Sequence, residues 1–248
     1  MQRKPSKRAI ENEVLSQHIK RIFEEHKGRY GSIRIAKSLE KEGISANHKR
    51  IGRLMRVMGL YAKGTRYRYR HYHKTTNNED RPNLLNQIWI GDITYIHTKQ
   101  GYLYLAVFID VYSRRVVGWS MERRMKENLV IQAFLQAYGR ENPEQGLIVH
   151  TDQGSQYTGG SFRSILNSYG AIHSNSRKGN PYDNAMMESF YRTLKRELVQ
   201  GANFETPEQA QKEIFQYIEL YYNTKRMHSA LGYLSPAQFE AQQVVSQN

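Results

Sequence analysis

The spacing of apolar residues changes near residue 86, and this change constrains the fold more than any other feature of the 248-residue chain. Before it, apolar side chains recur every three or four residues, as in "SQHIKRIFEEHKGRYG" and "SIRIAKSLEKEGISANHKRIGRLMRVMGL". After it, "NQIWIGDITYIH" and "GYLYLAVFIDVYSRRVVGWSM" are rich in β-branched and aromatic residues. The first spacing is typical of amphipathic helices and the second of strands. We therefore expect a helical N-terminal region and a separate domain that contains a sheet.

The rest of the chain alternates between helical and strand-like patterns. An amphipathic stretch, "KENLVIQAFLQAYGR", precedes the short apolar run "LIVH", and a helical stretch near residues 159–169 precedes "AIHS". The polar segment "NSRKGNPYDN" and the long helical pattern "AMMESFYRTLKRELV" follow. Short connections between the first three strands predict an antiparallel meander, and the later alternation predicts an α/β domain with a mixed sheet flanked by helices.

The excess positive charge is confined to the N-terminal third of the chain. Residues 1–76 contain 20 of the 37 Lys and Arg residues but 6 of the 23 Asp and Glu residues, so they carry the whole net charge of +14. Such a block is typical of a segment that binds a polyanion such as DNA. A solvated face that keeps the protein soluble is the alternative interpretation.

Composition also limits the compartment and the chemistry. The chain contains no cysteine, which excludes disulfides and zinc sites built on thiolates and fits a reducing environment. No apolar run approaches the ~20 residues that span a bilayer, and no apolar signal-peptide core follows the basic N-terminus. We therefore expect a cytoplasmic protein with no membrane partner.

A helix-turn-helix pattern lies within the basic block, in residues 1–60. The turn-like "EGIS" separates two helical stretches, and the second stretch carries Lys49, Arg50, Arg53 and Arg56. Two helices joined by a tight turn, with cations on the second, are the outline of a DNA-binding motif. A helical hairpin with a basic exposed face has the same pattern. Because the pattern coincides with the charge block, we predict that these four side chains contact DNA.

Residues 61–83 alternate tyrosines with Arg66, Arg68 and Arg70 and offer no apolar face to bury. Such a composition favours an extended linker between domains. Arginines bind phosphates and tyrosines stack on bases or sugars, so the three arginines are further candidates for DNA contact.

Three carboxylates stand in unusual contexts in the second half of the chain. Asp92 lies inside the apolar strand "WIGDITY", Asp152 follows the run "LIVH", and Glu188 lies among apolar residues in the first turns of a helix. Fifty-nine residues separate the two aspartates, and 35 separate Asp152 from Glu188. A buried carboxylate needs a hydrogen-bonded, ionic or metal partner. Each of these carboxylates alone is consistent with a structural role. Together, on separate elements, they are enough to bind magnesium, because this ion prefers a few carboxylate ligands plus water and substrate phosphate.

The motifs around these carboxylates identify a family resemblance. "WIGDITY", "HTDQGSQY" and "GNPYDNAMMESFYRTLKREL" resemble the three signature blocks of the D-D-E transposases and retroviral-type integrases. The match is closest to bacterial insertion-sequence transposases of the IS-three group. "RYGSIRIAKSLEKEGISANHKRIGRLMRVMGL" resembles the helix-turn-helix-like block of that group, and "YYNTKRMHSALGYLSPAQFE" resembles its C-terminal signature. The resemblance covers residues 17 to 240.

The resemblance implies a ribonuclease-H-like catalytic core in residues 84–200, followed by a C-terminal helical region in 201–248. It also implies metal-dependent DNA cleavage and joining, with Asp92, Asp152 and Glu188 holding two Mg²⁺ or Mn²⁺ ions. Water cuts one strand at the end of an insertion sequence, and the freed 3′-hydroxyl then attacks another phosphodiester. The expected partners are the terminal inverted repeats, the target DNA and further copies of this chain, as a dimer or larger assembly in the bacterial nucleoid.

The resemblance also sorts the remaining candidate residues. Arg192 and Lys195 share a helical face with Glu188 and are expected to contact the DNA end, with a solvated helix face as the alternative. Further candidates for contact with DNA or support of the site are Lys178, Tyr157 and Asn184. The competing acids Asp110 and Asp183 are not metal ligands in the family pattern, so we expect Asp110 to bond near Ser113, Arg114 or Arg115 and Asp183 to cap a helix. His150 is expected to support the site.

Two other function classes stay open: a DNA-binding module without catalysis, and a structure-specific nuclease that cuts but does not join.

Transposases of this group are usually made by frameshifting, and the upstream frame supplies a further helix-turn-helix and a leucine zipper. This chain shows neither motif, so it is expected to be the downstream product or a truncated portion.

Overall fold

The computed structural model of the protein describes residues 6–64, 88–176 and 185–246. They form two compact units, one within Met1–His73 and the other within Lys74–Asn248. The C-terminal helices belong to the same unit as the sheet. The four expected regions, 1–60, 61–83, 84–200 and 201–248, stay predictions.

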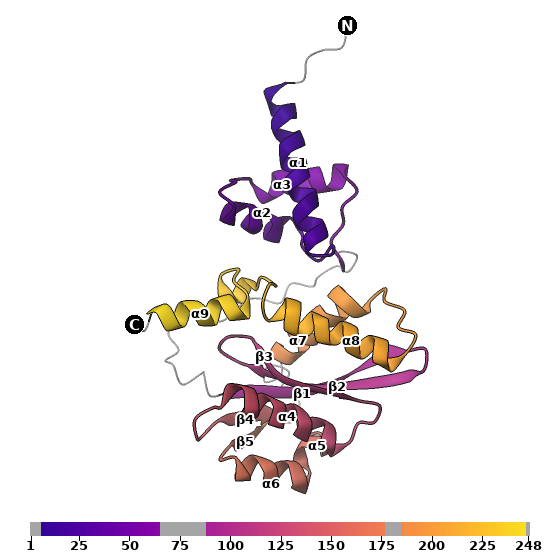
Figure 1. The fold of residues 1–248 in the computed structure, drawn as a ribbon, viewed down its shortest axis with the longest axis vertical. Helices are drawn as coiled ribbons and strands as arrows, with labels where there is room; N and C mark the ends of the chain where they lie inside the picture. The colour runs from indigo at the N-terminus through magenta and orange to yellow at the C-terminus, as the bar shows by residue number, and fades with distance from the viewer. Residues whose placement is uncertain (1–5, 65–87, 177–184, 247–248) are drawn as a thin grey trace. The chain divides into compact units, whose positions relative to one another are not determined.

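The first unit consists of helices, as the apolar spacing predicts (Figure 1). They are α1 (Lys7–Glu25), α2 (Ser32–Lys41) and α3 (His48–Val57). Each helix buries one apolar stripe against the other two, because its apolar residues recur at helical spacing. The buried residues are Leu15, Ile19 and Ile22 of α1, Ile35 and Leu39 of α2, and Ile51 and Met55 of α3. The side chain of Asn47 accepts a hydrogen bond from the Lys49 amide at 2.8 Å and so caps α3.

The second unit is built on a five-stranded mixed sheet with the order β3-β2-β1-β4-β5. The strands are β1 (Ile88–Thr98), β2 (Gly101–Asp110), β3 (Val116–Glu122), β4 (Ile148–Thr151) and β5 (Ile172–Asn175). The first three form the antiparallel meander that the sequence predicts. Strand β4 pairs in parallel with both β1 and β5, so the mixed sheet is confirmed.

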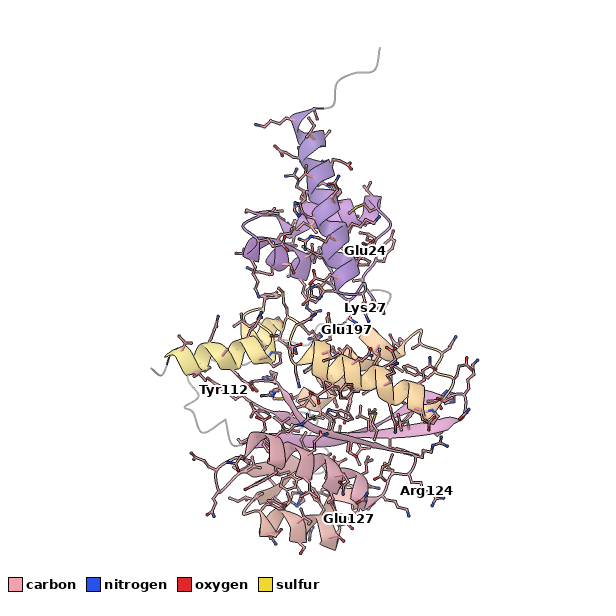
Figure 2. All side chains as sticks on the ribbon, in the orientation of Figure 1. Glu24, Lys27, Tyr112, Arg124, Glu127 and Glu197 are labelled. Carbon is pink, nitrogen blue, oxygen red and sulfur yellow. The ribbon has the colours of Figure 1, made fainter. Side chains whose placement is uncertain are left out.

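Helices cover both faces of this sheet (Figure 1). One face carries α4 (Glu127–Glu141), α5 (Ser155–Thr158) and α6 (Gly160–Ser168), and the other carries α7 (Ala185–Leu194) and α8 (Pro207–Tyr217). The last helix is α9 (Pro236–Ser246). A carboxylate joins two of the helices: Glu127, labelled in Figure 2, accepts a hydrogen bond from the Phe162 amide at 2.7 Å. Within the described ranges, none of the helices could span a bilayer.

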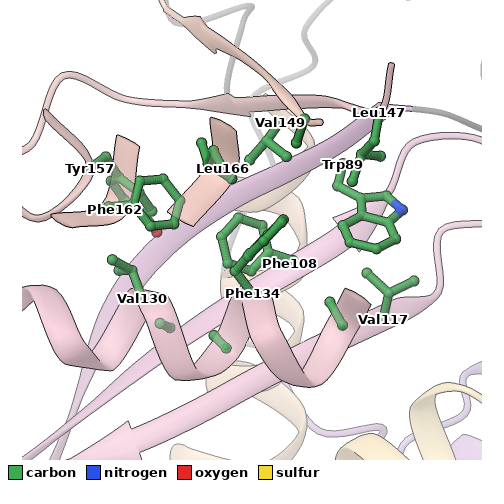
Figure 3. Packing of buried hydrophobic residues seen from close by; sticks show 14 of the residues in the cluster. Trp89, Phe108, Val117, Val130, Phe134, Leu147, Val149, Tyr157, Phe162 and Leu166 are labelled. Carbon is green, nitrogen blue, oxygen red and sulfur yellow. The ribbon is translucent and has the colours of Figure 1, made fainter. Parts of the chain in front are cut away.

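The main apolar core lies between the sheet and α4–α6 (Figure 3). It is centred on aromatic rings from four elements: Trp89, Phe108, Phe134 and Phe162. Two strand glycines permit this packing. A Cβ at Gly91 would come within 2.3 Å of the Phe108 ring, and one at Gly118 would come within 2.3 Å of the Ala133 carbonyl oxygen on α4. The glycine before Asp92 is therefore required by the ring that packs on β1.

A buried ion pair ties the C-terminal residues to the end of α7. A π-helical turn, Lys195–Val199, follows α7 and carries Glu197, which is 1% exposed. The Arg226 guanidinium donates to both Glu197 carboxylate oxygens at 2.9–3.2 Å, and the Tyr217 hydroxyl donates to one of them at 2.9 Å. Figure 2 labels Glu197 at this junction. Separation of the two partners would leave a buried charge without its counter-charge. The pair therefore holds α7, α8 and the C-terminal segment in one arrangement.

Candidate active site

Strand register brings Asp92 and Asp152 to neighbouring positions. Strands β1 and β4 run in parallel, and Gly91 opposite Thr151 is the last residue pair of their ladder. Asp92 directly follows Gly91 and Asp152 directly follows Thr151, so the two aspartates are next to each other in the same register. Neighbouring strands lie ~4.8 Å apart and side chains alternate between faces, which places both carboxylates on one face of the sheet. Gly91 faces the Phe108 ring in the core beside α4–α6, so Asp92 faces the other side of the sheet, which α7 and α8 cover in Figure 1.

Local amides orient both carboxylates. Asp92 accepts a hydrogen bond from the Ile93 amide at 2.7 Å, and Asp152 accepts one from the Gly154 amide at 2.9 Å. Both residues are half-buried. Their headgroups are therefore held by the backbone at the place where the β1–β4 ladder ends.

Helix α7 supplies the third carboxylate. The helix buries Met187, Phe190, Tyr191 and Leu194, whose spacing places them on one face. Glu188 lies beside this face, and its side chain is 54% exposed. It pairs with Arg192, one turn further along, at 3.9 Å. The third acid is therefore on a rigid element, although its carboxylate faces solvent.

A hydrogen bond joins α7 to the strand that carries Asp92. The Tyr191 hydroxyl donates to the Asp92 backbone carbonyl at 2.5 Å. Tyr191 lies three residues after Glu188, about one helical turn, so the two side chains occupy neighbouring positions on α7. The bond thereby sets the position of Glu188 along β1.

Two buried tyrosines lie in the electric field of both aspartates. Burial raises the pKa of the Tyr157 hydroxyl well above its ordinary value, and the charges of Asp92 and Asp152 raise it further. Burial likewise raises the pKa of Tyr191, and its interactions with Asp92, Tyr157 and Asp152 raise it further. Both hydroxyls therefore stay protonated. The Tyr157 hydroxyl is buried and has no hydrogen-bond partner among the described residues.

The oxygen donors fit a hard divalent cation, but they are not gathered into a finished site. Asp92 and Asp152 supply two carboxylates on one sheet face, which suits Mg²⁺ or Mn²⁺. In the described part of the chain, no three His, Asp or Glu side chains converge closely enough to hold a metal ion. The exposed carboxylate of Glu188 points instead to Arg192.

Comparison with known proteins identifies the family. Residues 82–181 and 188–244 match models described as "Integrase core domain", and residues 9–69 match an "HTH-like domain". The chain is 61% identical to the transposase for insertion sequence element IS904 of Lactococcus lactis, over 97% of this chain and 98% of the relative. It is 40% identical to the transposase InsF for insertion sequence IS3A of Escherichia coli, over 88% of this chain and 79% of that relative. The chain belongs to the IS3 group of insertion-sequence transposases.

The fold of this transposase is that of the integrases. A chain of the simian T-cell lymphotropic virus intasome, solved with the PP2A regulatory subunit B56 gamma, aligns with a TM-score of 0.50. The alignment covers 82% of the transposase and 69% of that chain at 19% identity. The ribonuclease-H-like core and the helix-turn-helix-like unit expected from the sequence are thus confirmed. The activity is DNA transposition, by strand cleavage and strand transfer.

The transposase uses two other polar residues near the site structurally. Asp110 accepts hydrogen bonds from the Ser113 amide at 2.7 Å and the Ser113 hydroxyl at 2.8 Å, in agreement with the predicted local role. The ring nitrogens of His150 bond the hydroxyls of Ser174 at 2.9 Å and Ser176 at 3.0 Å. His150 therefore fastens β4 to the end of β5, next to Asp152.

The predicted DNA-contacting cations of α3 differ in their surroundings. Lys49, Arg53 and Arg56 are exposed, and their spacing places them on one face. Arg50 is half-buried: its guanidinium donates to Asn12 at 2.9 Å and to Glu11 at 3.3 Å, both on α1. Arg50 therefore helps to pack α3 on α1.

Two more cations lie on the catalytic unit near Glu188. Arg192 is exposed and pairs with Glu188, whereas the Lys195 ammonium lies 5.0 Å from the centroid of the Tyr95 ring. The remaining predicted residues, Arg66, Arg68, Arg70, Lys178, Asp183 and Asn184, lie outside the described residues.

Sequence reasoning missed the role of Tyr191 and the Glu197–Arg226 pair. Tyr191 carries a usable signal, because a tyrosine one turn after Glu188 on an apolar helix face must bury its hydroxyl and find an acceptor. The acceptor belongs to a strand 99 residues earlier in the chain, so its identity depends on tertiary structure.

Proposed function

We propose that Asp92, Asp152 and Glu188 hold two divalent ions, Mg²⁺ or Mn²⁺, at which this transposase cuts and joins DNA. The observation that carries the proposal is the junction of three elements. The β1–β4 register brings the two aspartates to one sheet face, and the Tyr191–Asp92 hydrogen bond fastens the helix of Glu188 beside them. The two integrase core matches, whose ranges include all three residues, support the assignment.

The protein's own contribution is to orient the ligands. When bound, two ions activate the attacking oxygen and stabilise the leaving oxygen of a phosphoryl displacement. The Ile93 and Gly154 amides hold the carboxylates of Asp92 and Asp152, so these side chains lose little conformational freedom when they bind the ions. The neutral hydroxyls of Tyr157 and Tyr191 add no negative charge beside the aspartates.

Glu188 joins the site at small energetic cost. It gives up an exposed pair with Arg192, and such pairs one helical turn apart contribute only about 0.3–0.5 kcal/mol. A carboxylate placed against a divalent ion gains far more than this, because the ion carries the largest local charge. Released from Glu188, Arg192 becomes available to a DNA phosphate.

The substrates we propose are the terminal inverted repeats and the target DNA. The helix-turn-helix-like unit presents Lys49, Arg53 and Arg56 on one face of α3, which suits the DNA backbone or a groove. Joining brings two DNA ends together, so we propose a dimer or larger assembly on DNA in the bacterial cytoplasm, at the nucleoid. Light scattering with and without DNA measures the assembly; a monomeric complex that still joins ends would contradict it.

Two alternatives predict different products. A structure-specific nuclease cuts DNA but does not join it, and a binding module does neither. The test is a strand-transfer assay on labelled DNA from the element ends, beside a gel shift, with Asp92→Asn, Asp152→Asn and Glu188→Gln. Each variant should bind DNA but neither cut nor join it, because each loses a ligand charge at nearly constant shape. A variant that retains strand transfer removes its residue from the proposed site.

A further inference from the structure

Three aromatic rings are exposed on the hairpin of β1 and β2. Tyr95 and His97 lie on β1 and Tyr102 lies on β2; we call them the hairpin aromatic patch. The ring centroids of Tyr95 and Tyr102 are 5.5 Å apart, and those of His97 and Tyr102 are 5.4 Å apart. Tyr95 is 57% exposed and Tyr102 is 51% exposed, so the protein leaves about half of each tyrosine in contact with solvent.

The patch lies partly on the strand of Asp92 and is contacted from the turn that follows the helix of Glu188. Tyr95 follows Asp92 by three residues on β1, which corresponds to ~10 Å along the strand, and because side chains alternate between faces its ring lies on the sheet face opposite to Asp92. Lys195, seven residues after Glu188, lies over the Tyr95 ring at 5.0 Å from its centroid. Three steps of a DNA strand also span ~10 Å, at 3.4 Å per nucleotide. The ladder with β4 ends at Gly91, so a DNA strand with its phosphate at Asp92 reaches the patch within a few nucleotides by passing the edge of β1 beside Lys195.

We propose that the hairpin aromatic patch stacks on unpaired bases of the DNA next to the reacting phosphate. The inference rests on the proposed catalytic site, because that site places the phosphate near Asp92. Exposed aromatic rings beside a cation are the elements with which proteins bind single-stranded DNA: the rings stack on bases and the cation meets the phosphates. Paired bases hide their faces within the duplex, so the patch distinguishes an opened DNA end from a closed one.

Cross-strand contact between the rings also stabilises the hairpin. That contact accounts for the short distances between the rings. It does not account for the large exposed fraction of both tyrosines, nor for the Lys195 ammonium above Tyr95. The two roles are separated by substitutions that keep the strand but change the ring.

The test compares two duplexes of about 20 base pairs, one blunt and one with a short single-stranded overhang that carries 2-aminopurine. Binding is measured without divalent metal, so the result does not depend on the proposed metal ligands. The wild-type protein should bind the overhang duplex roughly tenfold more tightly than the blunt one and should quench the 2-aminopurine fluorescence by stacking. Equal affinities without quenching would overturn the inference.

Variants then assign the effect to the patch. The double variant Tyr95→Leu/Tyr102→Leu should lose the preference and the quenching but keep its affinity for the blunt duplex. Tyr95→Phe/Tyr102→Phe retains the rings and should behave as wild type. Tyr169→Leu is the matched control, because Tyr169 is a 38%-exposed tyrosine that packs on Tyr138 away from the patch. A leucine double variant that still quenches would show that the bases stack elsewhere. Should that variant unfold, Tyr95→Leu alone is compared with Tyr95→Phe, and equal quenching by the two would equally overturn the assignment.

Discussion

The hydroxyl of Tyr191, on α7, donates a 2.5 Å hydrogen bond to the backbone carbonyl of Asp92, on β1. Tyr191 is 7% exposed, so its hydroxyl has little access to solvent as a replacement partner. The bond links the strand that carries one proposed metal ligand to the helix that carries another. Its removal therefore tests whether the spacing between these elements matters for catalysis.

We expect Tyr191→Phe to reduce strand transfer by about 10- to 100-fold, the usual effect of losing a residue that supports a metal site. The variant should also need a higher Mg²⁺ concentration for half-maximal activity, because Glu188 is less well placed. Loss of the hydroxyl removes this hydrogen bond, which costs about 0.5–1.5 kcal/mol of stability. The measurements are strand transfer against Mg²⁺ concentration and urea unfolding.

Tyr217→Phe is the matched control for Tyr191→Phe. It also removes a buried hydroxyl, but one that donates to Glu197 at 2.9 Å and not to the Asp92 carbonyl. The control should lose a similar amount of stability and keep its Mg²⁺ dependence. If both variants show the same Mg²⁺ dependence as the wild type, Tyr191 is a structural residue only.

The exposed cations of α3 should contribute to DNA affinity through phosphates. Substitution of Lys49, Arg53 or Arg56 by glutamine should weaken binding and lower the slope of log affinity against log salt by about one per residue. Arg50→Gln should mainly destabilise the N-terminal unit, because Arg50 bonds Asn12 and Glu11 on α1. Fluorescence anisotropy over a range of salt concentrations measures the slopes. A larger change of slope for Arg50 than for the other three would contradict this division of roles.

Asp110 should make stability depend on pH. Burial is the main cause that raises the pKa of Asp110 to about 6 from its ordinary 3.8. The folded state therefore holds this proton more tightly than the unfolded state, and stability falls as the pH rises through this range. The difference of about two pKa units corresponds to at most roughly 3 kcal/mol.

The check is urea unfolding of the wild type and Asp110→Asn across this pH range. Asparagine keeps an acceptor for Ser113 and carries no charge, so the variant should lose much of the fall in stability with rising pH. Some fall should remain, because burial also raises the pKa of the neighbouring Glu141. An unchanged pH profile in Asp110→Asn would show that Asp110 is not the titrating group.

The strands and helices were predictable from the sequence because their periodicity is local. The runs around Trp89 and Phe108 carry strand spacing over ten or more residues, and the structure has strands there. The three acids could be proposed because apolar surroundings make each of them conspicuous. Their neighbourhood required the parallel β1–β4 register, in which one step of slip would turn Asp152 to the opposite sheet face.

Other features of the site depend on contacts between distant residues and could not be predicted. Arg50 carries the same local signal as Arg53, yet it packs on α1 while Arg53 is exposed. Glu197 and Arg226 belong to segments that are separate in sequence and meet only when the C-terminal helices pack on α7. A pattern of residue types predicts which side chains are charged, whereas tertiary packing decides which of them stay exposed.

The central claim is that Asp92, Asp152 and Glu188 bind the catalytic ions, and a change of metal preference tests it most directly. Because the chain contains no cysteine, a single cysteine at Asp92 or Asp152 is the only thiol present. Thiolates are poor ligands for Mg²⁺ and better ligands for softer metal ions. We measure strand transfer by Asp92→Cys and Asp152→Cys in Mg²⁺ and in Mn²⁺, with Asp110→Cys as the control.

The account predicts that Asp92→Cys and Asp152→Cys are inactive in Mg²⁺ and recover strand transfer in Mn²⁺, because the thiolate then coordinates the ion. The variants Asp92→Asn and Asp152→Asn should stay inactive in both metals, and Asp110→Cys should show no switch of metal preference. Full activity of either cysteine variant in Mg²⁺ would contradict the proposed metal site.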